Sequence, residues 1–160
     1  MRTETITRAI YTFEELSDRA KEKARDWYRE GIDLAWSDES LESIKAFCEA
    51  HGARLTDWQV GPYCAYHYRT DATNANFRGL KLRDVNRDNM PTGYCLDCDL
   101  WMTFYDSFKK TGDALEAFRD ALDAGFAAWQ RDMEYQLSDE AVDESIQING
   151  YEFTESGRLA

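Results

Sequence analysis

The sequence lacks long hydrophobic runs, has little proline or glycine, and has no excess of basic residues. No stretch approaches the about 18 uncharged apolar residues of a membrane-spanning helix, and residues 1–8 contain no apolar signal-peptide core. We therefore expect a cytoplasmic protein. With two Pro and nine Gly, and with 43% apolar residues, the composition excludes disorder as the main state. The net charge of −12 argues against a protein that binds nucleic acid or an anionic membrane directly, because both need a basic surface.

Catalytic motifs are missing as well. The chain contains two histidines and has no Gly-x-Ser-x-Gly motif, no glycine-rich phosphate loop and no His-Glu-x-x-His motif. Among 31 carboxylates, no pair stands out as a general acid and base. We therefore expect no enzyme and assign no catalytic residue. His51 falls at the end of a predicted helix, where the helix dipole favours a charged imidazole and a capping role.

The hydrophobic pattern predicts about five helices in one domain over residues 1–160. The length favours a single domain that can bury a core. Apolar residues recur at i+3 and i+4, and Ser17 and Ser138 are candidate N-caps. The predicted helices cover residues 17–31, 38–51, 94–108, 113–136 and 138–145.

Strands are predicted at both ends of the chain and in a central hairpin. The hairpin joins residues 53–60 and 64–69 through a Gly61-Pro62 turn. Residues 5–12 alternate loosely, and residues 146–153 alternate around an Asn149-Gly150 turn signal. A weak strand is predicted at residues 77–85. The expected fold is α+β, with one small antiparallel sheet (N-terminal strand, central hairpin, C-terminal strand) packed against the helices.

Cys64-x-x-His67 and Cys95-x-x-Cys98 together form a set with zinc-ligand spacing. Two observations oppose a zinc site. Cys64 and His67 lie three apart on a predicted strand, which points them to opposite faces, and Cys95 and Cys98 are flanked by residues typical of a helical core. We expect reduced thiols with no metal and no cofactor, and we keep a zinc-stabilised domain as an alternative.

The acidic residues are concentrated toward the C-terminus. Residues 1–89 contain 16 acids and 14 Lys plus Arg, whereas residues 90–160 contain 15 acids and five Lys plus Arg. Like charges at i+4 weaken a helix slightly, so this pattern costs stability. There are two interpretations of the acidic surface of these C-terminal helices. It is either a solvated surface that maintains solubility, or a surface that resembles a run of phosphates and binds a basic nucleic-acid channel. The candidate partner-binding residues are Asp120, Asp123, Asp139, Glu140, Asp143 and Glu144.

Tyrosines in the central hairpin are a second sign of an interaction surface. Tyr63, Tyr66 and Tyr68 cluster around His67, and tyrosine is enriched in binding hot spots. Core packing is the alternative role for at least half of these rings.

Both ends of the chain resemble a group of small phage and prophage accessory proteins. The resemblance lies in Tyr11–Glu30 (YTFEELSDRAKEKARDWYRE) and Asn149–Arg158 (NGYEFTESGR). Some members of this group are described as antitoxins. The resemblance implies an origin in a mobile element, and small acidic proteins of that origin are often anti-CRISPR or anti-restriction inhibitors.

The sequence and the resemblance together lead to one functional hypothesis. We expect a non-enzymatic, phage-encoded counter-defence inhibitor in the host cytoplasm. It would bind a host defence protein or ribonucleoprotein complex, with its acidic C-terminal helical surface acting as a nucleic-acid mimic, and would bind neither nucleic acid nor membrane directly. The alternatives are an antitoxin-like protein that neutralises a toxin by protein–protein contact and a small zinc-stabilised interaction domain.

Overall fold

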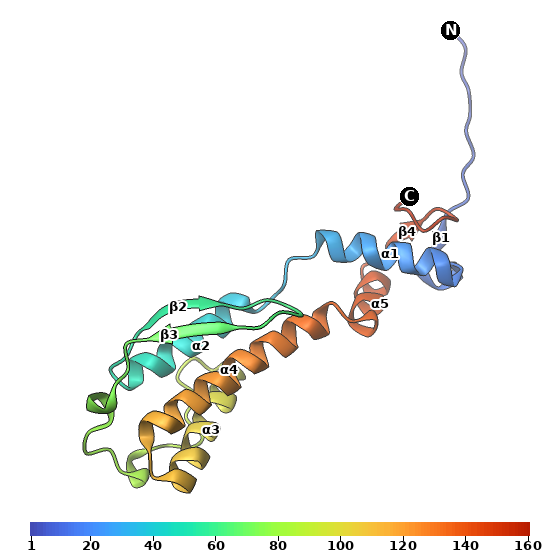
Figure 1. The fold of residues 1–160 in the computed structure, drawn as a ribbon. Helices are drawn as coiled ribbons and strands as arrows, with labels where there is room; N and C mark the ends of the chain where they lie inside the picture. The colour runs from blue at the N-terminus through green and yellow to red at the C-terminus, as the bar shows by residue number, and fades with distance from the viewer. The chain divides into compact units, whose positions relative to one another are not determined.

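The computed structural model describes all 160 residues, and the chain groups into two compact units (Figure 1). The first unit combines Met1–Asp33 with Tyr135–Ala160, and the second consists of Leu34–Glu134. Five helices and two antiparallel sheets of two strands each confirm the α+β class and the expected number of helices. None of the helices combines the length and the apolar character that crossing a membrane requires. The expectation of a single domain stays a prediction.

The first unit is built from the two ends of the chain. Helix α1 (Asp18–Gly31) packs with helix α5 (Asp139–Ile148), and strand β1 (Tyr11–Thr12) pairs with strand β4 (Glu152–Phe153). The buried core lies between these elements and consists of Phe13, Leu16, Ala20, Ala24, Val142, Ile146 and Phe153.

Both predicted serine caps are confirmed. The Ser17 hydroxyl accepts a hydrogen bond from the Ala20 amide, and the Ser138 hydroxyl accepts one from the Ala141 amide, each at 3.3 Å. These bonds satisfy backbone donors that have no partner inside the helix. Short polar side chains before an apolar stripe therefore fix where α1 and α5 begin.

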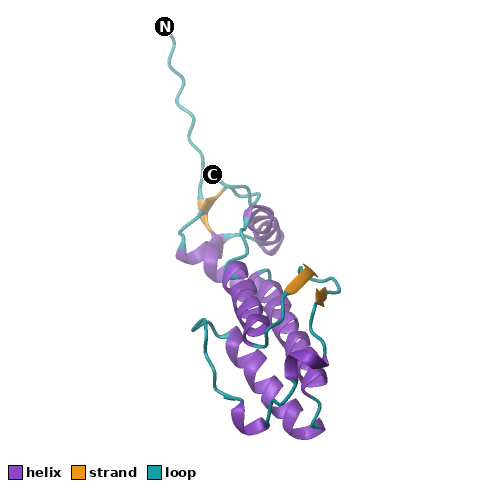
Figure 2. Cartoon of the chain, turned by 90° about the vertical axis from the view of Figure 1, so that its left-hand side faces the viewer, coloured by secondary structure: helices purple, strands orange, loops and turns teal.

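The second unit has a helical core covered by a hairpin. It contains α2 (Ser37–Ala50), α3 (Leu96–Thr111) and all but the last two residues of α4 (Ala114–Gln136). Strands β2 (Leu55–Gln59) and β3 (His67–Thr70) form the predicted antiparallel hairpin. Figure 2 shows that helices make up most of the ordered secondary structure.

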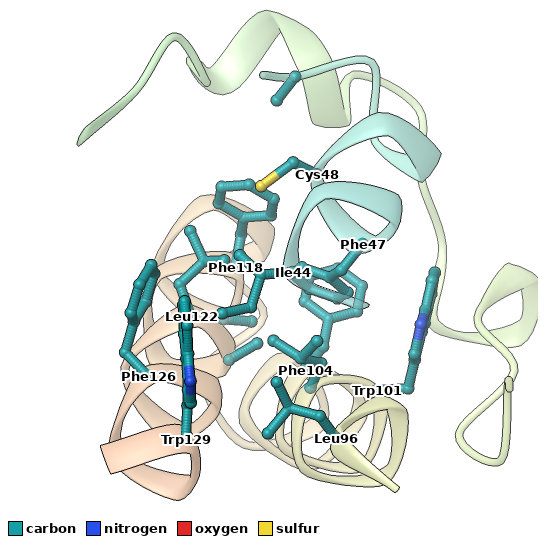
Figure 3. Close-up of a cluster of buried hydrophobic side chains, with 14 of the residues drawn as sticks. Ile44, Phe47, Cys48, Leu96, Trp101, Phe104, Phe118, Leu122, Phe126 and Trp129 are labelled. Carbon is teal, nitrogen blue, oxygen red and sulfur yellow. The ribbon is translucent and has the colours of Figure 1, made fainter. Parts of the chain in front are cut away.

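Aromatic rings fill the centre of the second unit, where side chains from α2, α3 and α4 meet (Figure 3). Phe47 of α2 stacks on Phe118 of α4 with ring centroids 5.3 Å apart and meets Phe104 of α3 edge-on. Helices α3 and α4 also approach closely at Gly125, where an added Cβ would lie 2.6 Å from a methyl group of Leu100. A larger residue at this position would require the buried Leu100 side chain to move.

The prediction of one shared sheet is wrong. Strands β1 and β4 do pair, but the hairpin of β2 and β3 forms a separate sheet. Only Tyr11–Thr12 of the predicted first strand is paired, because its partner β4 is just two residues long. A two-residue ladder is too short to show the alternation of inward and outward side chains predicted over residues 5–12.

Two further predictions are corrected. Asn149-Gly150 is not a hairpin turn: Asn149 caps the C-terminus of α5, and Gly150 follows with φ +64°. The helical stripe of Val142 and Ile146 simply continues past the predicted end. The weak strand at residues 77–85 is absent, and two 3-10 turns, Asn74–Phe77 and Leu82–Asp84, occupy this region. Phe77 is buried against the helical core, which explains its apolar character.

Gly157 allows the C-terminal segment to lie directly on the backbone of α1. It has φ +82°, and a Cβ at this position would lie 2.1 Å from the carbonyl oxygen of Ala20. Gly150 also has a positive φ, +64°, but an added Cβ there would meet nothing within 4 Å. A substitution at Gly150 therefore adds backbone strain alone, whereas a substitution at Gly157 adds both backbone strain and a steric clash.

We predict that Gly157→Ala destabilises the protein more than Gly150→Ala. Both substitutions carry the left-handed backbone penalty of about 1–2 kcal/mol, but only Gly157→Ala adds a clash with backbone atoms that cannot move independently, costing about 1–3 kcal/mol more. Urea unfolding followed by circular dichroism measures the difference. Equal losses in the two variants would show that the C-terminal segment does not rest on α1.

Candidate acidic interaction surface

The six predicted binding carboxylates are divided between the two units. Asp120 and Asp123 lie on α4 in the second unit, whereas the other four lie on α5 in the first unit. The structure therefore does not gather all six within one unit. They differ further in what each carboxylate already binds.

Asp120 and Asp123 accept hydrogen bonds within the second unit. The Ser107 hydroxyl donates to Asp120 Oδ2 at 2.6 Å, and the Tyr68 hydroxyl donates to Asp123 Oδ1 at 3.0 Å. The Tyr68 ring stacks on Phe126 at 4.9 Å. Burial, together with the bond to Asp123, raises the pKa of Tyr68. Asp123 thus helps to fix the hairpin on α4.

Asp143 holds α1 against α5. The Arg25 guanidinium makes a two-pronged contact with it, from Nε to Oδ1 at 2.6 Å and from Nη2 to Oδ2 at 2.7 Å. The side chains of Arg25 and Asp143 are only 16% and 27% exposed. Water therefore screens this pair less than a surface pair. The bond to Asp143 raises the pKa of Arg25.

Asp139 makes the second connection between the same helices. Arg29 Nη2 bonds to its carboxylate, and Arg29 Nε donates to the carbonyl oxygen of Leu137 at 2.9 Å. Arg25 Nη1 lies 3.7 Å from the same carboxylate. Asp139 and Asp143 are thus engaged in joining α5 to α1.

Glu140 and Glu144 remain. They lie one turn apart on α5, are exposed, and have no hydrogen-bond or ion-pair partner. Ile148, with 76% of its surface exposed, follows Glu144 by one further turn. Val142 and Ile146 are buried in the core of the unit. We call the surface formed by Glu140, Glu144 and Ile148 the outer face of α5.

The folded units also redistribute the charge. The first unit contains 14 acids and eight Lys plus Arg, and the second contains 17 acids and 11 Lys plus Arg, so each carries a net −6. The imbalance along the sequence disappears because the Arg-containing N-terminal segment folds with the acidic C-terminal one. Negative charge is therefore a property of both units.

Sequence reasoning missed a second set of free carboxylates, on α2. Four acids of this helix are exposed and unpaired: Asp38, Glu39, Glu42 and Glu49. Their spacing opposite the buried Ile44 and Phe47 was visible in the sequence. The nearly balanced charge of residues 1–89, with 16 acids and 14 Lys plus Arg, conceals this acidic face in the sequence.

The Cys and His residues with zinc-ligand spacing do not form a site. No group of three or more His, Cys, Asp or Glu side chains is arranged to hold a metal ion. The four cysteines are free thiols. His67 Nε2 lies 3.4 Å from Asp57, and Cys98 Sγ lies 3.5 Å from Met90 Sδ. We do not propose a zinc site.

The tyrosine cluster divides between core and surface. Tyr66 and Tyr68 both stack on Phe126, at 5.8 and 4.9 Å, and so pack against the helical core. Tyr63 is 73% exposed, and its backbone is left-handed with φ +56°. Only Tyr63 of the three remains open for a partner.

His51 is not the charged helix cap that the sequence suggested. Its ring lies among aromatic side chains, 4.5 Å from Phe104 and 4.9 Å from Phe47, and Nε2 is buried without a hydrogen-bond partner. Burial lowers the pKa of His51 to about 4. Desolvation outweighs the helix dipole here, so the imidazole is neutral at pH 7. Its backbone amide still caps α2 through the Cys48 carbonyl.

Comparison of the chain with protein-family models, with curated proteins and with solved structures found no match.

We predict that Asp143→Asn lowers the free energy of unfolding by about 1–3 kcal/mol, because it removes the charge from a half-buried, two-pronged contact with Arg25. The matched control is Glu144→Gln, which makes the same charge change on an exposed residue without a partner and should stay within about 0.5 kcal/mol of wild type. Urea unfolding measures both. Similar stabilities for the two variants would contradict the assigned role of Asp143.

We also predict that His51 contributes to acid unfolding. The pKa of His51 is about 4 in the folded protein and 6.5 for the ordinary imidazole. Between pH 4 and pH 6.5 the unfolded chain therefore binds a proton at His51 that the folded protein does not bind, and this favours unfolding. The neutral imidazole of His51 makes its full contribution to the free energy of unfolding above about pH 6.5. This contribution, up to roughly 3 kcal/mol, is lost as the pH falls toward 4. In His51→Phe, the decrease in stability from pH 7 to pH 4.5 should be smaller than in wild type. Parallel pH profiles would show that His51 is accessible to protons in the folded state.

Proposed function

We propose that the protein is a non-enzymatic, phage-encoded inhibitor that binds the basic nucleic-acid site of a host defence protein or ribonucleoprotein complex. The outer face of α5 makes the contact. The observation that supports this most directly is the pair of exposed, unpartnered carboxylates at Glu140 and Glu144. The phage origin rests on the resemblance carried by Tyr11–Glu30 and Asn149–Arg158.

Carboxylates that already form ion pairs within the protein are less available to bind a partner. Asp139 and Asp143 would have to leave Arg25 and Arg29 before they bound another cation, and the lost contacts would offset the gain. Glu140 and Glu144 give up only hydration. Their backbone positions lie about 6 Å apart along the helix, so two basic side chains of one partner surface can reach them together.

The charge of the whole protein supports the same proposal. A net charge of −12 attracts a basic channel over distance and raises the rate of encounter. Screening limits this attraction to about 8–10 Å at physiological salt. The interaction should therefore weaken as salt is added, as the binding of nucleic acid to the same channel would.

An antitoxin-like role is the second candidate, and exposed aromatic side chains favour it. Trp36 and Tyr63 are 57% and 73% exposed, and they are the two non-glycine residues with positive φ, at 66° and 56°. The Trp36 ring stacks on Tyr94 at 6.1 Å and still has more than half of its surface exposed, and exposed aromatic rings of this kind suit an apolar protein–protein contact. Binding of that kind would persist at high salt, which distinguishes the two candidates.

We predict that Glu140→Lys/Glu144→Lys reduces capture of the partner complex from host lysate by at least about tenfold, because like charges then face each other across the contact. The matched control is Glu152→Lys/Glu155→Lys, which changes the charge equally in the same unit at exposed residues without partners and should retain capture. Circular dichroism verifies that both variants fold.

Capture at increasing salt completes the experiment. The proposal requires a nucleic-acid-binding complex that elutes as salt rises. Equal capture by both double variants would refute a role for the outer face of α5. Retention of a small partner at high salt would favour the antitoxin-like role instead.

A further inference from the structure

A cavity of about 300 Å³ opens at the C-terminal end of α1, within the first unit. The last turn of the helix, the residues that follow it and Tyr151 line this cavity. Its lining consists of Trp27, Tyr28, Gly31, Ile32, Asp33 and Tyr151. We call it the α1 cup.

The aromatic lining of the α1 cup suits a cation. Trp27 and Tyr151 lie with ring centroids 5.1 Å apart at 81°, and Tyr28 meets the two rings at 63° and 60°. Ring faces carry the negative part of the aromatic quadrupole and attract positive groups. The cation–ring contacts within the chain involve Phe13 and Trp58 instead. The faces of the cup rings therefore hold no cation of the protein itself.

The end of α1 adds a second attraction. The last four carbonyl groups of a helix lack partners inside it, and the helix dipole places partial negative charge there. Ile32 leaves the helix in an extended conformation, with φ −76° and ψ 131°. Arg29 is the basic residue of the last turn, but its guanidinium is bound to Leu137 and Asp139. The Arg29 guanidinium is therefore not available to fill the cup.

A carboxylate provides the third attraction. Asp33 lines the cup, is exposed and has no hydrogen-bond or ion-pair partner. Glu30 is likewise exposed and unpaired one turn earlier but does not line the cavity. Three aromatic side chains and an unpaired carboxylate thus line one hollow at the C-terminal end of α1.

We infer that the α1 cup binds the guanidinium group of an arginine side chain on a partner protein. A guanidinium is planar and stacks on aromatic rings, and its five N–H donors can bond to carboxylate and carbonyl acceptors. A quaternary ammonium could use the rings but not these acceptors. The inference rests on the proposed function only for the basic character of the partner, since the cup is separate from Glu140 and Glu144.

The test uses the full chain and a defined probe. N-acetylarginine amide, which resembles an arginine residue within a polypeptide, is titrated into ¹⁵N-labelled protein, and N-acetylcitrulline amide is its uncharged counterpart. The Trp27 indole N–H signal, assigned with Trp27→Phe, reports on the cup. We expect a saturable shift of this signal with the arginine compound and none with the citrulline compound.

Two charge-matched variants locate the site. Asp33→Asn should weaken arginine binding by about two- to fivefold, as expected for the loss of an exposed ion pair, whereas Glu30→Gln should leave it near the wild-type value. Three results would each overturn the inference: no saturable shift at Trp27, equal losses in both variants, or tighter binding of tetramethylammonium than of the arginine compound. Because the probe requires neither a partner complex nor α5, these results are independent of the test of the proposed function.

Discussion

The ion pairs between α1 and α5 determine how the first unit is built and which of its charges remain for binding. Arg25 and Asp143 lie 118 residues apart in sequence, and their two-pronged contact, with Arg29 and Asp139 beside it, joins the two ends of the chain. The short pairing of β1 with β4 and the small core between the helices supplement this connection. A helix that looks uniformly acidic in sequence therefore presents one face to arginines and another to solvent.

The second unit depends on a different interaction, the packing of aromatic rings from three helices. Phe47, Phe104 and Phe118 meet at its centre, and the hairpin is fixed to α4 where Tyr66 and Tyr68 stack on Phe126. The same packing excludes water around His51 and keeps its imidazole neutral. Most aromatic residues of this unit belong to this core or pack against it, and they do not form an exposed patch.

Local sequence predicts local structure well in this chain. The helices follow from apolar residues at i+3 and i+4, and Ser17 and Ser138 mark helix starts through bonds to nearby amides. The sheets were less predictable, because a strand of two residues such as β1 has no periodicity to detect. The long-range pairing of Arg25 with Asp143 was hidden as well, since Glu22 one turn away offered the arginine a local partner. Because long-range ion pairs are not visible in the sequence, the pattern predicts six binding carboxylates. It does not show which of them are already paired with arginines and which are unpaired.

Occupation of a nucleic-acid site by the outer face of α5 is the central functional claim. It is tested most directly by measuring nucleic-acid binding to the captured partner complex while the concentration of the protein is increased. We predict mutual exclusion: the apparent affinity for nucleic acid should fall in proportion to the amount of protein added, because both ligands use the same basic residues. A complex that holds the protein and the nucleic acid together, with unchanged affinity for each, would contradict the claim.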